Sequence, residues 1–299
     1  MRIFLTGATG FIGSAIVPEL LKAGHHVIGM TRSDAGARAL EEARVEVHRG
    51  VLEEPESVRA GVEKADAVIH TAFDHNFSRF AENCEKDSRV IAAMGEALKG
   101  SNRPLLITSG TGMGNAHFGE LASEDVFNIE HPNPRIASEL AGNALLDQGV
   151  NVSVMRLPQV HNTVKQGLVS PLIEIARQKG AVAYVGQGLN RFPAGHLLDV
   201  ALLYRLAIER AEPGARYNAV AEEGITTREI AEALGRGLEL PVISVAPEKA
   251  AEHFGWMAIF AGLDFPASSE KTRRILGWNP VGPGLIADLD AMDYGALAA

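Results

Sequence analysis

The stretch MRIFLTGATGFIG at residues 1–13 decides the fold of this chain. Residues 2–5 have the β-branched and aromatic character of a buried strand, and residues 14–21 repeat apolar side chains at helical spacing. Three glycines, Gly7, Gly10 and Gly13, lie between the two. A strand, a glycine-rich turn and a helix in this order predict a parallel α/β unit in which the helix N-terminus faces a phosphate group.

Each glycine has a separate role if the turn binds a dinucleotide. Gly7 allows the tight turn, Gly10 lets a pyrophosphate approach the backbone, and Gly13 lets the helix pack closely on the strand. The alternative is a glycine-rich turn without a ligand, but the place of the turn between strand and helix favours the dinucleotide. We expect the contacts to come from residues of this turn: Gly7, Thr9, Gly10, Phe11, Ile12 and Gly13.

The spacing Gly-x-x-Gly-x-x-Gly after Thr6 resembles the short-chain dehydrogenase/reductase superfamily, and TGATGFIG resembles its extended branch, the NAD(P)-dependent epimerase/dehydratase-like proteins. The resemblance covers nearly the whole chain. It implies an α/β fold, a Rossmann-type doubly wound parallel sheet with a smaller, interleaved C-terminal substrate lobe. The cofactor domain would span residues 1–161 with return elements at about 194–220, and the substrate lobe 162–193 and 221–299. A homodimer is a further expectation from the family.

The composition excludes several classes of function. With 46% hydrophobic residues, the 299-residue chain can bury a substantial core. The net charge of −9 argues against a nucleic-acid or anionic membrane partner, and no apolar run reaches the roughly 18 residues that span a bilayer. The single Cys84 excludes an intramolecular disulfide and is expected to be a buried structural thiol. No metal-ligand cluster is visible, and we expect a cytoplasmic protein with a small-molecule substrate.

The end of the second strand indicates which nicotinamide cofactor fits. Residues 26–30 form this strand, and Arg32 and Ser33 follow it. An acidic residue here would bond the ribose 2′-hydroxyl of NAD, whereas an arginine beside a hydroxyl offers charge-assisted bonds to a 2′-phosphate. Arg32 and Ser33 therefore favour NADP. The alternative is a solvated surface arginine, and Asp34 nearby carries the opposite charge.

The loops after later strands are expected to reach the same edge of the sheet. Val51 stands where the extended enzymes commonly have an aspartate that contacts adenine, so that contact would come from the backbone or be absent. Asp74 and His75 begin the loop after the fourth strand and are candidate substrate contacts, although a loop histidine is often only solvated. The resemblance implies further cofactor contacts at Leu52, Thr71, Ala72, Phe73, Pro158 and Val160.

The catalytic motif departs from the family pattern. Ser109 stands where the short-chain enzymes place the serine that binds the substrate carbonyl, and Thr111 is a second hydroxyl in that loop. In the family's Tyr-x-x-x-Lys motif, Arg135 replaces the tyrosine and Glu139 the lysine. An arginine is a poor proton donor but can stabilise negative charge, and a glutamate can accept bonds from ribose hydroxyls. The alternative is an intrahelical ion pair, because the two residues stand four apart.

With the tyrosine absent, His161 is a candidate general acid, because an ordinary histidine has a pKa of about 6.5. It lies in LPQVHN, after the strand at 150–156, a segment that resembles the family's Arg-Pro-x-x-Val-Tyr-Gly. The alternative is a histidine that only positions other groups.

The C-terminal part resembles the family's substrate lobe. Arg191 would face the substrate, and His196 would start a helix that packs back on the first domain and could also contact the substrate. Thr226 with Glu229 three residues later predicts a capped helix start. Trp256 belongs to an aromatic cluster that either covers a pocket or packs between the lobes.

These observations predict an NADPH-dependent reductase of a small carbonyl, enone or imine. Ser109 and Thr111 would orient the acceptor, Arg135 would stabilise negative charge, and His161 or water would supply the proton. Two alternatives stay open. The missing proton-transfer pair suits a non-catalytic NADP-binding regulator or redox sensor. An epimerase or dehydratase of a sugar-like substrate is the other, although a diphosphate substrate would require more basic residues in the second lobe.

Overall fold

The computed structural model describes residues 1–117 and 119–295. Its centre is a seven-stranded sheet with the order β10-β6-β5-β4-β1-β2-β3, in which every neighbouring pair is parallel. The strands are β1 (Arg2–Thr6), β2 (His26–Thr31), β3 (Glu46–Arg49), β4 (Ala67–His70), β5 (Leu105–Gly110), β6 (Val152–Leu157) and β10 (Arg216–Asn218). The strand order reverses between β1 and β4, as it does in doubly wound α/β folds.

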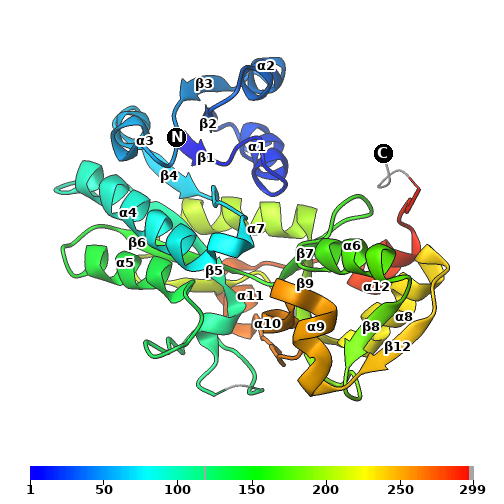
Figure 1. Ribbon diagram of the computed structural model, residues 1–299. Helices are drawn as coiled ribbons and strands as arrows, with labels where there is room; N and C mark the ends of the chain where they lie inside the picture. Colours follow the sequence, from blue (N-terminus) through cyan, green and yellow to red (C-terminus); the bar gives the residue numbers. More distant parts are fainter. Residues whose placement is uncertain (118, 296–299) are drawn as a thin grey trace.

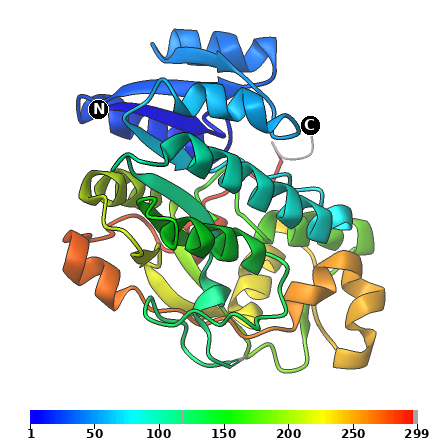
Figure 2. The same cartoon turned by 90° about the vertical axis from the view of Figure 1, so that its left-hand side faces the viewer.

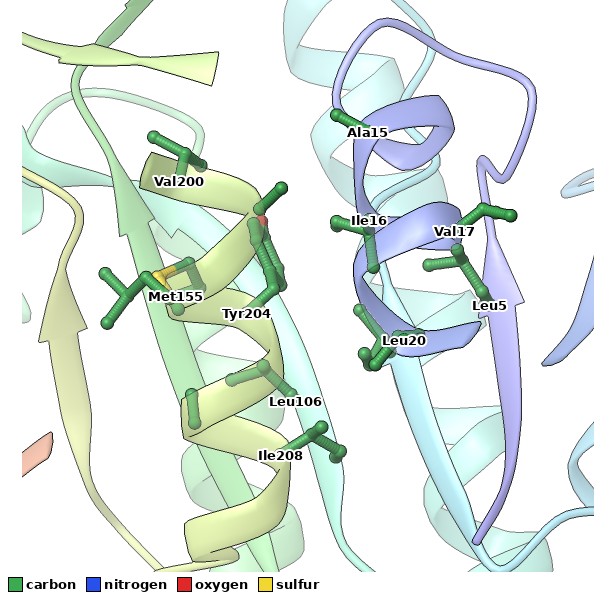
Figure 3. Close-up of a cluster of buried hydrophobic side chains, with 14 of the residues drawn as sticks. Leu5, Ala15, Ile16, Val17, Leu20, Leu106, Met155, Val200, Tyr204 and Ile208 are labelled. Carbon is green, nitrogen blue, oxygen red and sulfur yellow. The ribbon is translucent and has the colours of Figure 1, made fainter. Parts of the chain in front are cut away.

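Helices cover both faces of this sheet, which explains the continuous apolar runs of its central strands (Figure 1). Figure 3 shows Ile16 and Leu20 of α1 and Tyr204 and Ile208 of α7 in the apolar layer on one face. That face carries α1 (Gly13–Lys22), α2 (Asp34–Glu42) and α7 (Leu197–Arg210), and the other carries α3 (Pro55–Val62), α4 (Phe80–Leu98) and α5 (Ile136–Leu146).

The later part of the chain forms two small sheets. One has the order β11-β9-β7 and the other pairs β12 with β8. Figure 2 shows the yellow and orange part of the chain, which includes β11 and β12, at the opposite end of the molecule from the first strands and helices, in blue. The strands are β7 (Gln159–His161), β8 (Val182–Val185), β9 (Arg191–His196), β11 (Glu222–Thr226) and β12 (Val242–Val245). The helices are α6 (Val169–Lys179), α8 (Thr227–Leu238), α9 (Ala250–Phe254), α10 (Ala258–Ala261), α11 (Glu270–Leu276) and α12 (Leu285–Asp290).

Several sequence predictions are confirmed at the level of elements. The sheet confirms the doubly wound α/β fold, and β10 joins it beside β6 although some 60 residues separate them in the chain. Helix α8 has the predicted capping box: the Thr226 hydroxyl accepts a hydrogen bond from the Glu229 N–H, and the Glu229 carboxylate accepts one from the Thr226 N–H. Cys84 is buried and free. Among the described residues, no helix has the length and apolar character needed to cross a membrane.

Candidate active site

A large cavity lies at the carboxyl edge of the seven-stranded sheet. It is lined by residues that follow β1, β2, β4, β5 and β6. Ligands of open α/β sheets bind outside the strand ends where the strand order reverses, which here is the edge between β1 and β4. The cavity volume of about 1460 Å³ exceeds the roughly 300–1,000 Å³ of a site for one drug-sized ligand. The cavity therefore has room for a dinucleotide and a second molecule.

The glycine turn after β1 forms one end of this cavity. Gly7 has a φ of +69°, and a Cβ there would lie 2.7 Å from the Thr71 hydroxyl. A Cβ on Gly13 would lie 2.0 Å from the Gly7 carbonyl oxygen, so α1 could not begin so close to the turn with any other residue. No side chain caps the first amides of α1, and its first turn holds no acidic residue. The helix N-terminus is therefore available to an anion, and the six predicted residues of the turn all line the cavity.

Hydrogen bonds fix the end of β4 against the end of β1. The Thr71 hydroxyl donates to the Thr6 carbonyl at 2.7 Å, and the Ala72 N–H donates to the Thr6 hydroxyl at 3.2 Å. The same Thr6 hydroxyl lies 2.7 Å from Nδ1 of His70. Residues after β4, including Phe73, consequently form the wall beside the glycine turn.

A positively charged side chain, Arg32, lies at the cavity rim directly after β2. Arg32 is exposed, lines the cavity, and its side chain has no partner among the described residues. Asp34 is paired with Arg49 at 2.6 Å, and the Ser33 hydroxyl accepts a hydrogen bond from the Gly36 N–H as the N-cap of α2. Because its acidic neighbour is held elsewhere, Arg32 can meet an anionic group at this end. Ser33 and Leu52 also line the cavity.

Ser109, at the end of β5, is the most informative polar group of the cavity. Its side chain is 4% exposed, and its Oγ has no hydrogen-bond partner among the described residues. Buried hydroxyls are normally bonded, because burying one without a partner is costly. Ser109 and Thr111 both line the cavity, so Ser109 Oγ can bond a ligand there. Pro158 and Val160, which the family resemblance predicts to contact the cofactor, lie in the same lining.

Arg135 also lines the cavity, but its charge is already partnered. Its Nη1 donates to the Asp87 carboxylate at 2.7 Å, its Nη2 donates to the Thr108 carbonyl at 2.7 Å, and its guanidinium lies 4.2 Å from the centroid of the Phe73 ring. Burial alone would raise the pKa of Asp87, but the Arg135 charge and a hydrogen bond from His70 outweigh it and hold that pKa well below its usual range. Arg135 is therefore one half of a buried ion pair at the cavity wall.

The structure does not bring Glu139 to the cavity, and the alternative, an intrahelical ion pair between Glu139 and Arg135, does not form either. Glu139 is fully buried and accepts hydrogen bonds from Arg156 at 2.8 Å and from Arg216 at 3.0 Å. The reason is the orientation of α5, which begins at Ile136 and turns Glu139 toward β6 and β10. The expectation that Glu139 bonds a ribose is corrected accordingly.

Three further candidates lie outside the cavity. His161 is fully buried outside the cavity, with Nδ1 2.7 Å from the Asp288 carboxylate. His196 caps α7 by accepting from the Leu198 N–H. Arg191 is held by both carboxylate oxygens of Asp264, at 3.0 and 2.7 Å. Proton donation by His161 and substrate contacts by the other two are therefore not supported.

The substrate candidates Asp74, His75 and Trp256 do line the cavity. Asp74 forms an ion pair with Lys86 at 2.8 Å. Partial desolvation, with the charges of Arg135 and Lys165, lowers the pKa of His75, although the residue keeps a solvent-exposed surface. Among the described residues, no group of histidine, cysteine, aspartate and glutamate side chains could hold a metal ion.

Sequence reasoning missed two groups at the site. Lys165 lines the cavity with Nζ 5.7 Å from the centroid of the Phe11 ring in the glycine turn, and no carboxylate among the described residues pairs with it. A single lysine in an irregular loop has no sequence pattern that would identify it as a site residue. Asp87 lies in the middle of α4, where a charge is usually solvated, and only the fold shows that it meets Arg135.

Comparison with known proteins agrees with this geometry. The model of the NAD-dependent epimerase/dehydratase family matches residues 3–220. The chain belongs to this family. An uncharacterized protein of Schizosaccharomyces pombe is 45% identical over 295 residues, covering 98% of this chain and 100% of that protein. The 2-alkyl-3-oxoalkanoate reductase of Stenotrophomonas maltophilia is 29% identical, covering 72% and 67%.

Solved structures of the epimerase/dehydratase family share the fold. The UDP-glucose 4-epimerase of Thermus thermophilus, in complex with NAD, superimposes with a TM-score of 0.75 at 23% identity, covering 98% of this chain and 97% of that one. The family resemblance drawn from the glycine turn is thus confirmed. This chain differs from the family's Tyr-x-x-x-Lys motif at two positions, where Arg135 and Glu139 have the buried partners described above.

Proposed function

We propose that this chain is an NADPH-dependent reductase of a small carbonyl, enone or imine substrate. The observation that carries the proposal is the buried Ser109 hydroxyl, which lines the cavity without a partner. A hydroxyl in this state can donate a hydrogen bond to a carbonyl oxygen, which stabilises the negative charge that develops as the carbonyl is reduced. The Stenotrophomonas relative, named a reductase, supports the same class of reaction.

The dinucleotide fits the residues present. The glycine turn and the uncapped start of α1 would hold the pyrophosphate, with Lys165 as an additional cation near Phe11. Arg32, which has no partner of its own among the described residues, would bind a 2′-phosphate, and this supports NADP over NAD. When bound, the reduced nicotinamide supplies a hydride for the substrate carbon.

The proton must come from a group other than His161, which lies outside the cavity. His75 lines the cavity, but partial desolvation and the Arg135 charge lower its pKa and so disfavour the protonated form that a proton donor requires. We therefore assign the proton to water that reaches the substrate oxygen beside Ser109 and Thr111. Arg135 would orient the substrate through hydrogen bonds rather than supply a free positive charge, because Asp87 neutralises it.

A second function has a specific observation in its favour. The tyrosine and lysine of the family motif are both absent, and their replacements are held by Asp87, Arg156 and Arg216. A regulator or redox sensor that binds NADP without turnover would tolerate these changes.

The test compares binding and turnover in the purified protein. The wild type should bind NADPH and consume it with members of a panel of ketones, aldehydes, enones and imines, followed by NADPH absorbance. The S109A variant should bind NADPH as the wild type does but lose about 100-fold in kcat. Tight binding of NADPH with no consumption across the whole panel would support the regulator instead.

Cofactor choice is tested separately with R32D and the matched control R38D. Arg38 is exposed on α2 and outside the cavity, so both variants change the net charge equally. The preference for NADPH over NADH should fall at least tenfold in R32D and stay unchanged in R38D. An unchanged preference in R32D would show that Arg32 does not bind the 2′-phosphate.

A further inference from the structure

Six ring side chains form one wall of the cavity beyond the glycine turn. They come from two distant parts of the chain, the segment 73–80 after β4 and the segment 256–260 around η4 (Gly255–Met257) and α10. We call this set the aromatic wall, and all of its members line the cavity: Phe73, His75, Phe77, Phe80, Trp256 and Phe260.

The rings of the aromatic wall contact one another in a defined way. Phe77 and Trp256 are stacked, with centroids 4.6 Å apart and planes inclined by 6°. Phe260 meets Phe77 edge to face at 6.1 Å and Phe80 at 6.4 Å. Trp256 is still 39% exposed, so the stack is not closed on its outer side. Further rings can join such a cluster by offset stacking or edge-to-face contact.

Polar groups suited to a carbonyl lie in the same cavity. Phe73, the first member of the aromatic wall, lies under the Arg135 guanidinium. The two Nη atoms of that guanidinium donate hydrogen bonds to Asp87 and to the Thr108 carbonyl, while its Nε–H has no partner among the described residues. The unpartnered Ser109 hydroxyl is a second donor in the lining of this cavity.

The charges of the lining do not suit a substrate that carries a diphosphate. Among the described lining residues beyond Arg32, two cations, Lys165 and Lys179, lack an acidic partner. Lys165 is assigned to the cofactor above, Glu252 carries the opposite charge, and Glu174 is paired with Arg177 at 3.7 Å. A nucleoside diphosphate requires an excess of positive charge, as bidentate or paired cationic contacts. An uncharged substrate requires none.

We propose that the aromatic wall binds a planar aromatic ring attached to the carbonyl that is reduced, so that the substrate class is an aryl ketone or aryl enone. This rests on the proposed reductase function and adds to it the chemistry by which the substrate is recognised. The ring packs against the Phe77–Trp256 stack, and the carbonyl oxygen takes hydrogen bonds from Ser109 and Arg135.

Binding can be measured without turnover. The full chain, saturated with NADP⁺, is equilibrated by dialysis against 2-acetylnaphthalene, against its ring-saturated counterpart 2-acetyldecalin, or against UDP-glucose. Both ketones have the same carbon skeleton, but only one carries a planar aromatic ring, so tighter binding of the aryl ketone reports on that ring rather than on apolar area alone. We expect the aryl ketone to bind about tenfold more tightly than the saturated ketone, and UDP-glucose to show no binding. Equal or tighter binding of the saturated ketone or of UDP-glucose overturns the inference, as does the absence of binding by the aryl ketone.

Variants locate the site. W256L and F77L should each weaken 2-acetylnaphthalene binding about five- to tenfold while leaving the saturated ketone within about twofold. I259A is the matched control, because Ile259 is exposed beside Phe260 and outside the cavity, and it should bind both ketones as the wild type does. The comparison of the three ligands on the wild type tests the inference even if a variant does not fold.

The two proposals can fail separately. If 2-acetylnaphthalene binds as expected but no panel carbonyl consumes NADPH, the proposed reductase function fails and the aromatic site stands. If aliphatic carbonyls are reduced while the aryl ketone does not bind, the reductase function stands and the aromatic site fails.

Discussion

Replacing Arg135 by methionine should destabilise the folded protein strongly, even without any ligand. Arg135 is 13% exposed and Asp87 is 1% exposed, and their charged atoms lie 2.7 Å apart. Removing one member of a buried ion pair costs about 3–5 kcal/mol, since the other charge is left buried and unpaired. Asp87 would keep hydrogen bonds to His70 and Ser138, so we expect about 3 kcal/mol for R135M at pH 7.

The partner variant should cost less. In D87N the remaining charge is that of Arg135, which lines the cavity and can be solvated there. We therefore expect D87N to lower the free energy of unfolding by about 1–2 kcal/mol. The double variant should be more stable than the sum of the two single effects predicts, by at least about 1 kcal/mol, because neither charge is then left without its partner.

The loss in free energy of unfolding caused by R135M should also depend on pH. In the wild type the pKa of Asp87 lies below that of the unfolded chain, so its ionisation adds stability above about pH 4, and this is lost as the pH falls through the folded pKa. Without Arg135 the largest influence that lowers the pKa of Asp87 is lost while burial still raises it, so ionisation of Asp87 adds less stability than in the wild type. The stability difference should therefore be larger at pH 7 than at pH 4.5.

Urea unfolding followed by circular dichroism and by tryptophan fluorescence measures all four proteins, and coincident transitions are required before free energies are compared. A deficit below about 1 kcal/mol for R135M at pH 7 would refute the argument. So would a deficit that does not shrink at pH 4.5, or a double variant in which the two effects simply add.

Gly13→Ala should abolish NADPH binding or folding, because the new Cβ would lie 2.0 Å from the Gly7 carbonyl oxygen. Gly10→Ala should fold, because its Cβ would lie 3.2 Å from the same oxygen. Calorimetric titration of both variants with NADPH checks these expectations. Thr226→Ala removes the capping box of α8 and should cost about 1 kcal/mol in urea unfolding, while a loss below about 0.3 kcal/mol would speak against the cap. Burial raises the pKa of Cys84 to about 11, so roughly one thiol in 10⁴ is ionised at pH 7. The thiol should react with a disulfide reagent only as the chain unfolds, and rapid reaction of the native protein would contradict its burial.

The cofactor end of the cavity could be predicted from the sequence because its parts are adjacent in the chain. The strand, the glycine turn and α1 follow one another within 22 residues, and the constraints on Gly7 and Gly13 are local. Arg32 likewise follows directly after β2. The NADP preference and the homodimer stay predictions.

The catalytic end could not be predicted in the same way, since its contacts join distant residues. Arg135 meets Asp87, 48 positions earlier, and Glu139 meets Arg156 and Arg216 on two different strands. The alignment with the family motif identified the positions but not their partners.

The position of His161 could not be predicted from the sequence for the same reason. Val160 and His161 were both assigned to the cavity, but Val160 lines it and His161 contacts Asp288. Alternation along the strand does not separate them, because the consecutive residues Pro158, Gln159 and Val160 all line the cavity. The contact that holds His161 comes from a residue 127 positions later.

The missing tyrosine gains a structural explanation from the contacts of its replacement. The Thr6 hydroxyl, just before the glycine turn, contacts His70, His70 contacts Asp87, and Asp87 holds Arg135 against the ring of Phe73. A polar path thus joins the cofactor end of the cavity to the aromatic wall through the position that carries the proton donor in the family. A guanidinium fixed in this way can orient a substrate but is a poor proton donor. In the reduction that we propose, water would therefore supply the proton, and the unpartnered Ser109 hydroxyl would donate a hydrogen bond to the substrate oxygen.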